Sequence, residues 1–329
     1  MVIKPRKLKE GDYVGVVAPC SPIGSKTNKR FLYCLKAIEK LGLRYKVGKF
    51  ANKENDYMAG TPKERADDIN RFFADPEIKA IWCLKGGISG QLSLKYLDYK
   101  LIRNNPKIFI GYSDVVNYNL ALYTKSNLVN FYGPALTTFS DQMRKEKDKY
   151  YLDWTIKEVK KMLFESKPYG KVPTSKKYIL YGKKHENNGP KVINPGKAEG
   201  ILLGGHFYVF FITMFGTQYF PKIPKNTILF LEGGFGDPPV MEAYLWRLEE
   251  MGGFKNIKGI LVGRDHFSGK ECKTTSFEIL KKFGKKYNVP IITNLDFGHT
   301  DPMIPIPLGI KAKIDTSKKS FFIEESAVK

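Results

Sequence analysis

Short apolar runs alternate with amphipathic stretches through the first 135 residues, and this alternation predicts strands separated by helices. The strand-like runs cover 12–18, 78–84 and 107–110. Apolar residues recur at helical spacing in 31–41, and a capping box at Thr61 and Glu64 predicts a helix that continues to about residue 74. Strand, helix and strand follow one another at βαβ spacing, which favours a parallel sheet with helices on both faces.

The second half of the chain changes its pattern twice. Residues 141–162 are charged and helical in spacing, whereas 167–196 are rich in Lys, Gly, Pro and Asn, which predicts a linker or long surface loop that could cover a site. A second ordered region begins near residue 197. Its predicted strands are 200–203, 226–231, 257–262, 290–294 and 310–314, with helices at about 206–216, 238–251 and 273–287.

The length of 329 residues favours two domains over a single core. We therefore expect an N-terminal α/β domain over 1–165, a linker or surface loop over 166–196 and a C-terminal β/α domain over 197–329. No apolar run reaches the roughly 18 residues of a membrane span. The basic N-terminus has no apolar segment behind it, so it is not a signal peptide, and we expect a cytoplasmic protein.

The net charge of +22 comes mainly from lysine, with 46 Lys against nine Arg. The lysines are spread along the chain without an aromatic-interleaved basic motif, and we therefore expect a solvated lysine surface and no specific nucleic-acid partner. The four cysteines lack metal-ligand spacing, which predicts free thiols without a disulfide framework and no metal site.

Ser113 follows a predicted buried strand and Gly111, and it precedes an apolar helix. A hydroxyl on such a sharp turn lies at a helix N-terminus, where free N–H groups favour developing negative charge. This is the geometry of a serine nucleophile. Ser and Asp are also preferred helix caps, so Ser113 and Asp114 could simply cap the helix.

A nucleophilic serine needs a base and usually an orienting acid. Position at predicted strand ends favours His266 and His299 over His185 in the polar segment and His206 at a predicted helix start. Glu232 ends an almost wholly apolar strand, where a carboxylate needs a partner. Each of these residues also has a plain structural explanation.

Gly86 and Gly87 follow the strand that ends at Leu84. Glycines there let the backbone approach a ligand, and the pair could form half of an oxyanion hole, with the Asp114 N–H as the other half. An ordinary tight turn is the alternative.

Seven segments in register resemble the LD-carboxypeptidase family of serine peptidases, and more closely its microcin C immunity branch, often called MccF-like. The resemblance covers roughly residues 8–325. The segments are GVVAPCSP at 15–22, AGTPKERA at 59–66, KGG at 85–87, PKIFIGYSD at 106–114, FYGPAL at 131–136, LFLE at 229–232 and FGHTDPM at 297–303.

The resemblance implies a Ser–Glu–His triad, with Ser113 as nucleophile, His299 as general base and Glu232 as the orienting acid. It places the oxyanion hole at the N–H groups near Gly87 and of Asp114. It also implies a flavodoxin-like parallel sheet in the N-terminal domain, a swivelling-type C-terminal β/α domain, homodimers and no cofactor.

Two departures from the family pattern concern the substrate. The family usually has Gly-Gly-Asn-Leu where this chain has His206 in Gly-Gly-His-Phe. The immunity branch tends to have a Trp that stacks on a nucleobase in the loop before the second domain, but residues 187–193 contain none. Asp265 is the nearest candidate for the acidic residue that holds a substrate amino group, and Gly86 is a further candidate for contact with substrate.

We therefore expect a serine carboxypeptidase or amidase that acts on a small peptide-like substrate. An LD-peptide from cell-wall recycling and a peptidyl- or aminoacyl-nucleotide both remain open as substrates. The alternative is a catalytically inactive protein that binds a small ligand on the same scaffold.

Overall fold

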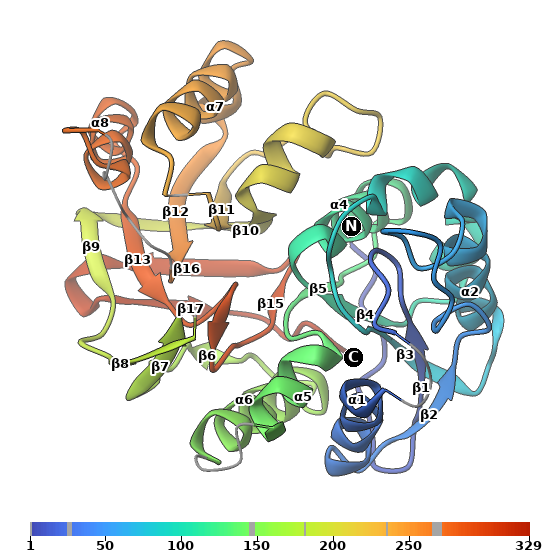
Figure 1. The fold of residues 1–329 in the computed structure, drawn as a ribbon. Helices are drawn as coiled ribbons and strands as arrows, with labels where there is room; N and C mark the ends of the chain where they lie inside the picture. Colours follow the sequence, from blue (N-terminus) through green and yellow to red (C-terminus); the bar gives the residue numbers. More distant parts are fainter. Residues whose placement is uncertain (1, 25–27, 145–148, 181, 235, 265–271) are drawn as a thin grey trace.

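Two large sheets, one mainly from each half of the chain, form the framework of the fold (Figure 1). The computed structural model describes residues 2–24, 28–144, 149–180, 182–234, 236–264 and 272–329. The C-terminal residue contacts the N-terminal segment, because the Lys7 N–H donates to the Lys329 carbonyl at 2.9 Å. The architecture is the α/β arrangement that the sequence predicts.

The N-terminal sheet has six strands in the order β15-β5-β4-β3-β1-β2. Five are parallel, and β15 pairs antiparallel with β5 at one edge. Its strands are β1 (Tyr13–Val17), β2 (Arg44–Val47), β3 (Ile78–Cys83), β4 (Ile108–Gly111), β5 (Phe131–Tyr132) and β15 (Ile306–Pro307). Because β15 comes from the C-terminal region, the end of the chain completes the N-terminal sheet.

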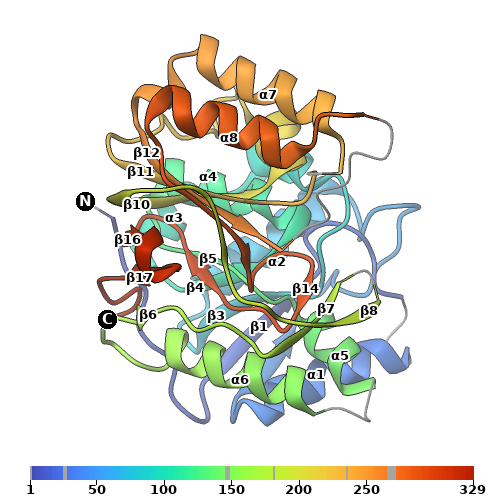
Figure 2. The same ribbon diagram turned by 90° about the vertical axis from the view of Figure 1, so that its left-hand side faces the viewer.

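Helices cover both faces of this sheet (Figure 2). α1 (Lys29–Lys40), α5 (Leu136–Arg144) and α6 (Tyr150–Leu163) pack together on one face. α2 (Pro62–Ala74), α3 (Tyr99–Asn104) and α4 (Val116–Ser126) lie on the other, with the short helices η1 (Gly90–Tyr96) and η2 (Ser113–Val115). The capping box predicted at Thr61 and Glu64 is present at the start of α2.

The C-terminal sheet has eight strands in the order β6-β17-β16-β10-β11-β12-β13-β9, of which β10 to β13 are parallel. These four are β10 (Lys197–His206), β11 (Thr227–Glu232), β12 (Ile257–Gly263) and β13 (Ile291–Leu295), and β16 (Lys311–Asp315) and β17 (Ser320–Ile323) extend the sheet. α7 (Pro238–Glu250) and α8 (Ser276–Tyr287) lie side by side over one face (Figure 2). The shorter helical segments are η3 (Val209–Met214), η4 (Gly253–Lys255) and η5 (Thr316–Lys318).

The segment 166–196, expected to be a linker or surface loop, contains four short strands instead. They are β6 (Gly170–Lys171), β7 (Lys177–Leu180), β8 (Lys183–Glu186) and β9 (Lys191–Asn194). β6 and β9 form the two edges of the eight-stranded sheet, whereas β7 and β8 form a hairpin that pairs with β14 (Thr300–Asp301). The polar composition hid these strands because β6, β7 and β9 each pair with a strand that comes much later in the chain, namely β17, β14 and β13.

No described helix has both the length and the apolar character that a membrane span requires. All four cysteines are free thiols, as predicted, and Cys20, Cys34 and Cys83 are buried.

Candidate active site

Ser113 lies on the sharp turn that the sequence predicts, between the end of β4 and the start of η2 and α4. Its φ is +62°, a left-handed conformation that is strained for a residue with a side chain. Gly86 packs directly against this turn, since a Cβ on Gly86 would lie 2.8 Å from Ser113 Cβ. A strained hydroxyl on a strand-to-helix turn is typical of a nucleophile elbow.

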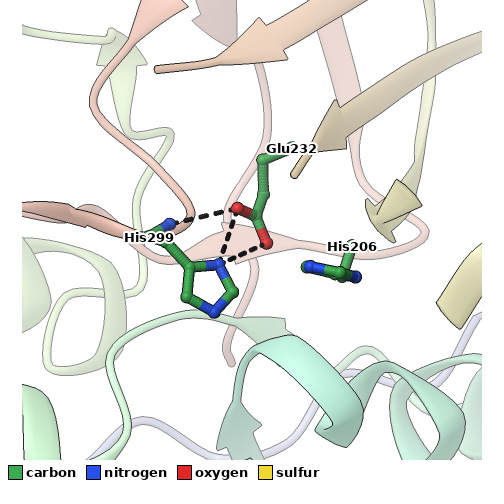
Figure 3. Close-up of side chains that lie close together, drawn as sticks. All are labelled: His206, Glu232 and His299. Atoms are coloured by element: carbon green, nitrogen blue, oxygen red, sulfur yellow. Dashed lines mark hydrogen bonds and ion pairs between the residues drawn. The ribbon is translucent and has the colours of Figure 1, made fainter. Parts of the chain in front are cut away.

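Glu232 and His299 form a hydrogen-bonded pair in the C-terminal region (Figure 3). Glu232 ends β11 and is 1% exposed, while His299 follows β13. Glu232 Oε2 lies 2.9 Å from His299 Nδ1 and also accepts the His299 backbone N–H at 3.1 Å. Gly298, with φ +92°, leaves the space that the carboxylate needs, because a Cβ there would collide with the Glu232 side chain.

The Glu232 carboxyl is held in its ionised form. Burial alone would raise its pKa, but the charges of the nearby His299 and His206 imidazoles act in the opposite direction. Hydrogen bonds from His299 and Tyr132 add to that effect, and the pKa falls to about 2. An ionised carboxylate beside Nδ1 keeps the proton on that nitrogen and leaves Nε2 to act as a base.

Two tyrosines connect the turn of Ser113 with this pair across the seam between the sheets. The Ser113 backbone N–H donates to the Tyr132 hydroxyl at 3.4 Å, and the same hydroxyl donates to Glu232 Oε1. The Tyr112 ring meets the His299 ring edge-on, with centroids 4.9 Å apart. The three residues that the sequence singled out therefore lie in one neighbourhood.

The Gly86–Gly87 loop is anchored beside Ser113. Ser21 donates its backbone N–H to the Gly86 carbonyl at 3.2 Å, and its Oγ accepts the Ile88 N–H at 3.3 Å. Gly87 has φ +127°, and a Cβ there would collide with the Ser21 side chain. Backbone groups of this loop can therefore approach a ligand near Ser113 more closely than any side chain would permit.

Asp114 connects the same loop to the turn of Ser113. Its carboxylate accepts the Gly90 N–H at 2.7 Å and an Asn117 side-chain N–H at 2.8 Å. The Asp114 backbone nitrogen lies 3.1 Å from the position of a Cβ on Gly86. The two amides proposed from the sequence for an oxyanion hole are thus on adjoining pieces of backbone.

Arg65 is a supporting residue whose role the sequence reasoning missed. The side chain is buried in α2 and donates from Nη1 to the Pro19 carbonyl at 3.1 Å. It also donates from Nη1 to Ser89 Oγ at 3.0 Å and from Nη2 to the Ser89 carbonyl at 3.2 Å. Its presence in the motif at 59–66 was the available signal, but only the fold shows that it holds the loop after Gly87.

Arg264 has an equivalent role in the loop that carries His299. It forms a buried ion pair with Asp296 at 2.5 Å and donates to Asn294 Oδ1 at 2.9 Å and to Thr300 Oγ1 at 3.3 Å. The guanidinium also lies over the Tyr178 ring, 3.9 Å from its centroid. These contacts fix both sides of His299 to the end of β12.

His206 lies beside the pair, although the sequence predicted it at a helix start. β10 continues to His206, which is in register with Glu232 on the neighbouring parallel strand. The helix is displaced because Gly204 and Gly205 allow β10 to follow β11 closely, and a Cβ on Gly204 would collide with the Phe230 carbonyl. The ring centroids of His206 and His299 are 5.3 Å apart. One donor atom each from His206, Glu232 and His299 lies within 4.8 Å of the other two (Figure 3).

His185 is the other histidine among the described residues, and it lies outside this cluster. His185 is exposed on β8 and stacks on Tyr178 with centroids 4.9 Å apart. His266 and the substrate-binding candidate Asp265 lie outside the described residues.

A cavity of about 240 Å³ adjoins His299. Its lining includes Tyr112 from the turn of Ser113, Ile179 from β7 and Asp301 from β14. The hairpin from the segment expected as a loop therefore forms part of the wall of the site.

Comparison with known proteins defines the class. A family model described as the LD-carboxypeptidase N-terminal domain matches residues 14–133, and one described as the LD-carboxypeptidase C-terminal domain matches residues 199–314. The fold and the two family models place the protein among the serine peptidases. The chain belongs to the LD-carboxypeptidase family.

Relatives of two kinds match nearly the whole chain. A probable murein peptide carboxypeptidase of Bacillus subtilis is 33% identical over 98% of this chain and 94% of its own length. The microcin C7 self-immunity protein MccF of Escherichia coli is 29% identical over 97% of this chain and 94% of its own length.

Solved structures show the same similarity. MccF in complex with glutamyl sulfamoyl guanosine has a TM-score of 0.89 and 27% identity, with 99% of both chains covered. An MccF-like protein from Bacillus anthracis has a TM-score of 0.87 and 30% identity, covering 98% of this chain and all of the other. The family supports hydrolysis of peptides by this chain.

Proposed function

We propose that the protein is a serine carboxypeptidase or amidase that cleaves an amide bond through a triad of Ser113, His299 and Glu232. The observation that carries this proposal is the buried Glu232 carboxylate that is hydrogen-bonded to His299, in the neighbourhood of a serine with a strained backbone at a strand-to-helix turn. This combination matches the nucleophile, base and orienting acid of acyl-transfer enzymes.

The reaction follows from these roles. Ser113 Oγ attacks the carbonyl carbon of the substrate while His299 Nε2 takes the hydroxyl proton. The tetrahedral oxyanion accepts hydrogen bonds from the backbone N–H groups of Gly87 and Asp114. The imidazolium then gives its proton to the leaving amine, and an acyl-enzyme remains. Water attacks this ester with His299 again as base, which releases the carboxylic acid and restores Ser113.

The substrate is a small peptide-like molecule in this proposal, and two classes compete. Curated relatives include a murein tetrapeptide carboxypeptidase of Pseudomonas aeruginosa, and MccF structures contain aminoacyl sulfamoyl nucleosides. Residues 187–193 of this chain contain no Trp for stacking on a nucleobase. This absence favours the LD-peptide over the nucleotide conjugate.

The test is an active-site serine probe together with product analysis. A fluorophosphonate should label the wild-type protein and not Ser113→Ala. The hydrolysis rate of the variant should be more than about a thousandfold below that of the parent. Ser126→Ala is a matched control. Ser126 is a buried serine at the C-terminal end of α4, the helix that follows the turn of Ser113, and its hydroxyl donates a hydrogen bond to the Tyr99 carbonyl. Hydrolysis by Ser113→Ala at the parent rate would end the proposal.

Mass spectrometry should then compare a murein tetrapeptide with an aminoacyl sulfamoyl adenosine. Release of the C-terminal residue of the tetrapeptide is the expected result, and faster cleavage of the nucleoside would reverse the preference. A properly folded protein that the probe does not label would instead support the non-catalytic ligand-binding alternative.

The resemblance to the family also predicts a homodimer, and the sequence separately led us to expect a location in the cytoplasm. Both stay predictions. Light scattering on the purified chain tests the first, and fractionation of the source cells tests the second.

A further inference from the structure

The cluster of His206, Glu232 and His299 presents a donor set that the peptidase mechanism does not need in full. Two imidazoles and one carboxylate face a common point from β10, the end of β11 and the loop after β13 (Figure 3). His206 and Glu232 are directly paired in register on adjacent parallel strands. Their relative position is therefore set by the sheet and does not depend on a flexible loop.

Two histidines and a glutamate are a common ligand set for Zn²⁺. Zinc bonds of about 2.0–2.2 Å to nitrogen and oxygen place tetrahedral ligand atoms roughly 3.3–3.6 Å from one another. The donor atoms of this cluster lie within 4.8 Å of one another, and Nδ1 of His299 is already 2.9 Å from Glu232 Oε2. Small rotations of side chains would therefore bring all three donors onto one ion.

The surroundings also suit a cation. Glu232 has an outer partner, because the Tyr132 hydroxyl donates to its Oε1, and such partners orient metal-binding carboxylates. The His299 side chain is 39% exposed and borders the cavity described above, so the cluster is open to solvent on the side of His299. His206 supplies the third ligand at the position where the family usually has Asn, a weaker ligand for zinc.

We propose that His206, Glu232 and His299 form an inhibitory binding site for a divalent transition-metal ion of the zinc type. The inhibitory part rests on the proposed function, in which Glu232 and His299 are the orienting acid and the base. A cation bound to Glu232 and to Nδ1 of His299 displaces the proton from Nδ1. The neutral imidazole then carries its one proton on Nε2, which can no longer accept the proton of Ser113. Loss of the metal to a chelator restores the triad, which makes the inhibition reversible.

The first measurement is direct binding, which does not depend on turnover. The full-length protein, stripped of metal with a chelator and dialysed, is titrated with Zn²⁺ alone by calorimetry. We expect one site of micromolar affinity or tighter that His206→Asn weakens by about tenfold or more. His185→Asn is the matched control, since His185 lies on the exposed hairpin strand β8, and it should bind as the parent does.

Cobalt provides a second probe of the same ligands. Co²⁺ bound by two imidazoles and a carboxylate in four-coordinate geometry gives visible absorption, which His206→Asn and Glu232→Gln should abolish while His185→Asn retains it. Circular dichroism checks that each variant is folded, and His206→Gln replaces His206→Asn if the latter is not. Zinc affinity that is the same in the parent, His206→Asn and Glu232→Gln would overturn the proposal, as would the absence of binding below millimolar zinc.

The activity measurement separates this proposal from the proposed function. Zinc should inhibit hydrolysis by the parent and EDTA should restore it, and His206→Asn should need about tenfold more zinc for the same inhibition. A protein that binds zinc at this cluster but hydrolyses no amide contradicts the proposed function and leaves the metal site standing. A protein that hydrolyses peptides and shows no zinc-dependent inhibition contradicts the metal proposal alone.

Discussion

The Tyr132 hydroxyl donates a hydrogen bond to Glu232 Oε1 across the seam between the two sheets. The Tyr132 hydroxyl oxygen also accepts the Ser113 backbone N–H at 3.4 Å. Burial and the nearby Glu232 charge raise the pKa of Tyr132 well above its usual value, so the phenol stays protonated and can donate. One side chain from β5 of the N-terminal sheet therefore contacts both the turn of Ser113 and the carboxylate of Glu232.

Replacing this tyrosine tests its positioning role. Tyr132→Phe removes the donor from a buried carboxylate oxygen and the acceptor from the Ser113 N–H, and each lost bond costs about 1–3 kcal/mol. We expect kcat to fall by about tenfold or more, with a smaller change in KM. Steady-state kinetics on the preferred substrate measures both values.

Tyr99→Phe is the matched control for Tyr132→Phe. Tyr99 is the first residue of α3, a helix that carries no residue of the candidate triad, and its hydroxyl donates to the Leu94 carbonyl at 2.8 Å. We expect Tyr99→Phe to lower the free energy of unfolding without lowering kcat. Equal kcat values for Tyr132→Phe and the parent would show that the two hydrogen bonds of the Tyr132 hydroxyl do not matter for turnover.

Gly87→Ala should remove the oxyanion contribution. The φ of +127° is unfavourable for alanine, and the new Cβ collides with Ser21, which anchors the loop. The loop must move, and loss of one oxyanion donor typically costs about 10²–10³ in kcat. Gly216→Ala provides the control, because it has φ +85° with no atom within 4 Å of the added Cβ. If both variants kept parent kcat, the Gly87 amide would have no part in catalysis.

Arg65→Lys should also loosen the loop that follows Gly87, which Arg65 holds at Ser89. Lysine cannot reproduce the two-nitrogen contact with Ser89 and the bond to the Pro19 carbonyl, and buried acceptors are left unpaired. We expect kcat/KM to fall about tenfold and unfolding free energy to fall by about 1–3 kcal/mol.

Arg71→Lys in the same helix is the comparison for Arg65→Lys. Arg71 is half exposed and pairs with Asp68 at 2.7 Å, so its replacement should cost less than about 1 kcal/mol and leave kcat/KM unchanged. Urea denaturation and kinetics on both variants give the result. Similar losses in the two variants would show a general effect of shortening α2 side chains.

Asp114→Asn should alter both stability and its pH dependence. The carboxylate accepts hydrogen bonds from Gly90, Asn117 and the Cys20 thiol, whereas an amide offers a single acceptor oxygen. One donor then faces an NH₂ group, at a cost of about 1–3 kcal/mol near neutral pH, and the loop anchored at Gly90 loosens.

The pH dependence follows from burial, which raises the pKa of Asp114 against the opposing effect of its hydrogen bonds and of Arg65. The folded state thus holds the proton more tightly than the unfolded state, whose pKa is about 3.9. The wild type should gain stability relative to Asp114→Asn as pH falls from the raised pKa toward 3.9, and lose that gain as pH rises. Urea midpoints of the two proteins between pH 4 and 7 measure the difference. A wild type that loses stability faster than the variant on acidification would contradict the prediction.

Local patterns in the sequence were enough to predict much of the fold. The capping box at Thr61, the apolar strand that ends at Glu232 and the glycine before the turn of Ser113 act over a few residues, so they can be recognised without a structure. The residues Ser113, Glu232 and His299 were identified by motif, and the structure brings them into one neighbourhood. Their catalytic roles, like those of Gly87 and Asp114, stay predictions.

Pairing between distant segments was decided only by the tertiary structure. Strands β6 and β9 lie in a polar stretch and pair with β17 and β13, which come much later in the chain. The β7–β8 hairpin likewise pairs with the distant β14, and β15 crosses from the C-terminal region to pair with β5. The position of His206 against Glu232 depends on two glycines that let β10 follow β11, and Arg65 reaches Ser89 only because α2 packs beside that loop. Such relationships depend on strand register and helix packing, which are settled by the burial of the whole apolar core and leave no periodic signal in a short window.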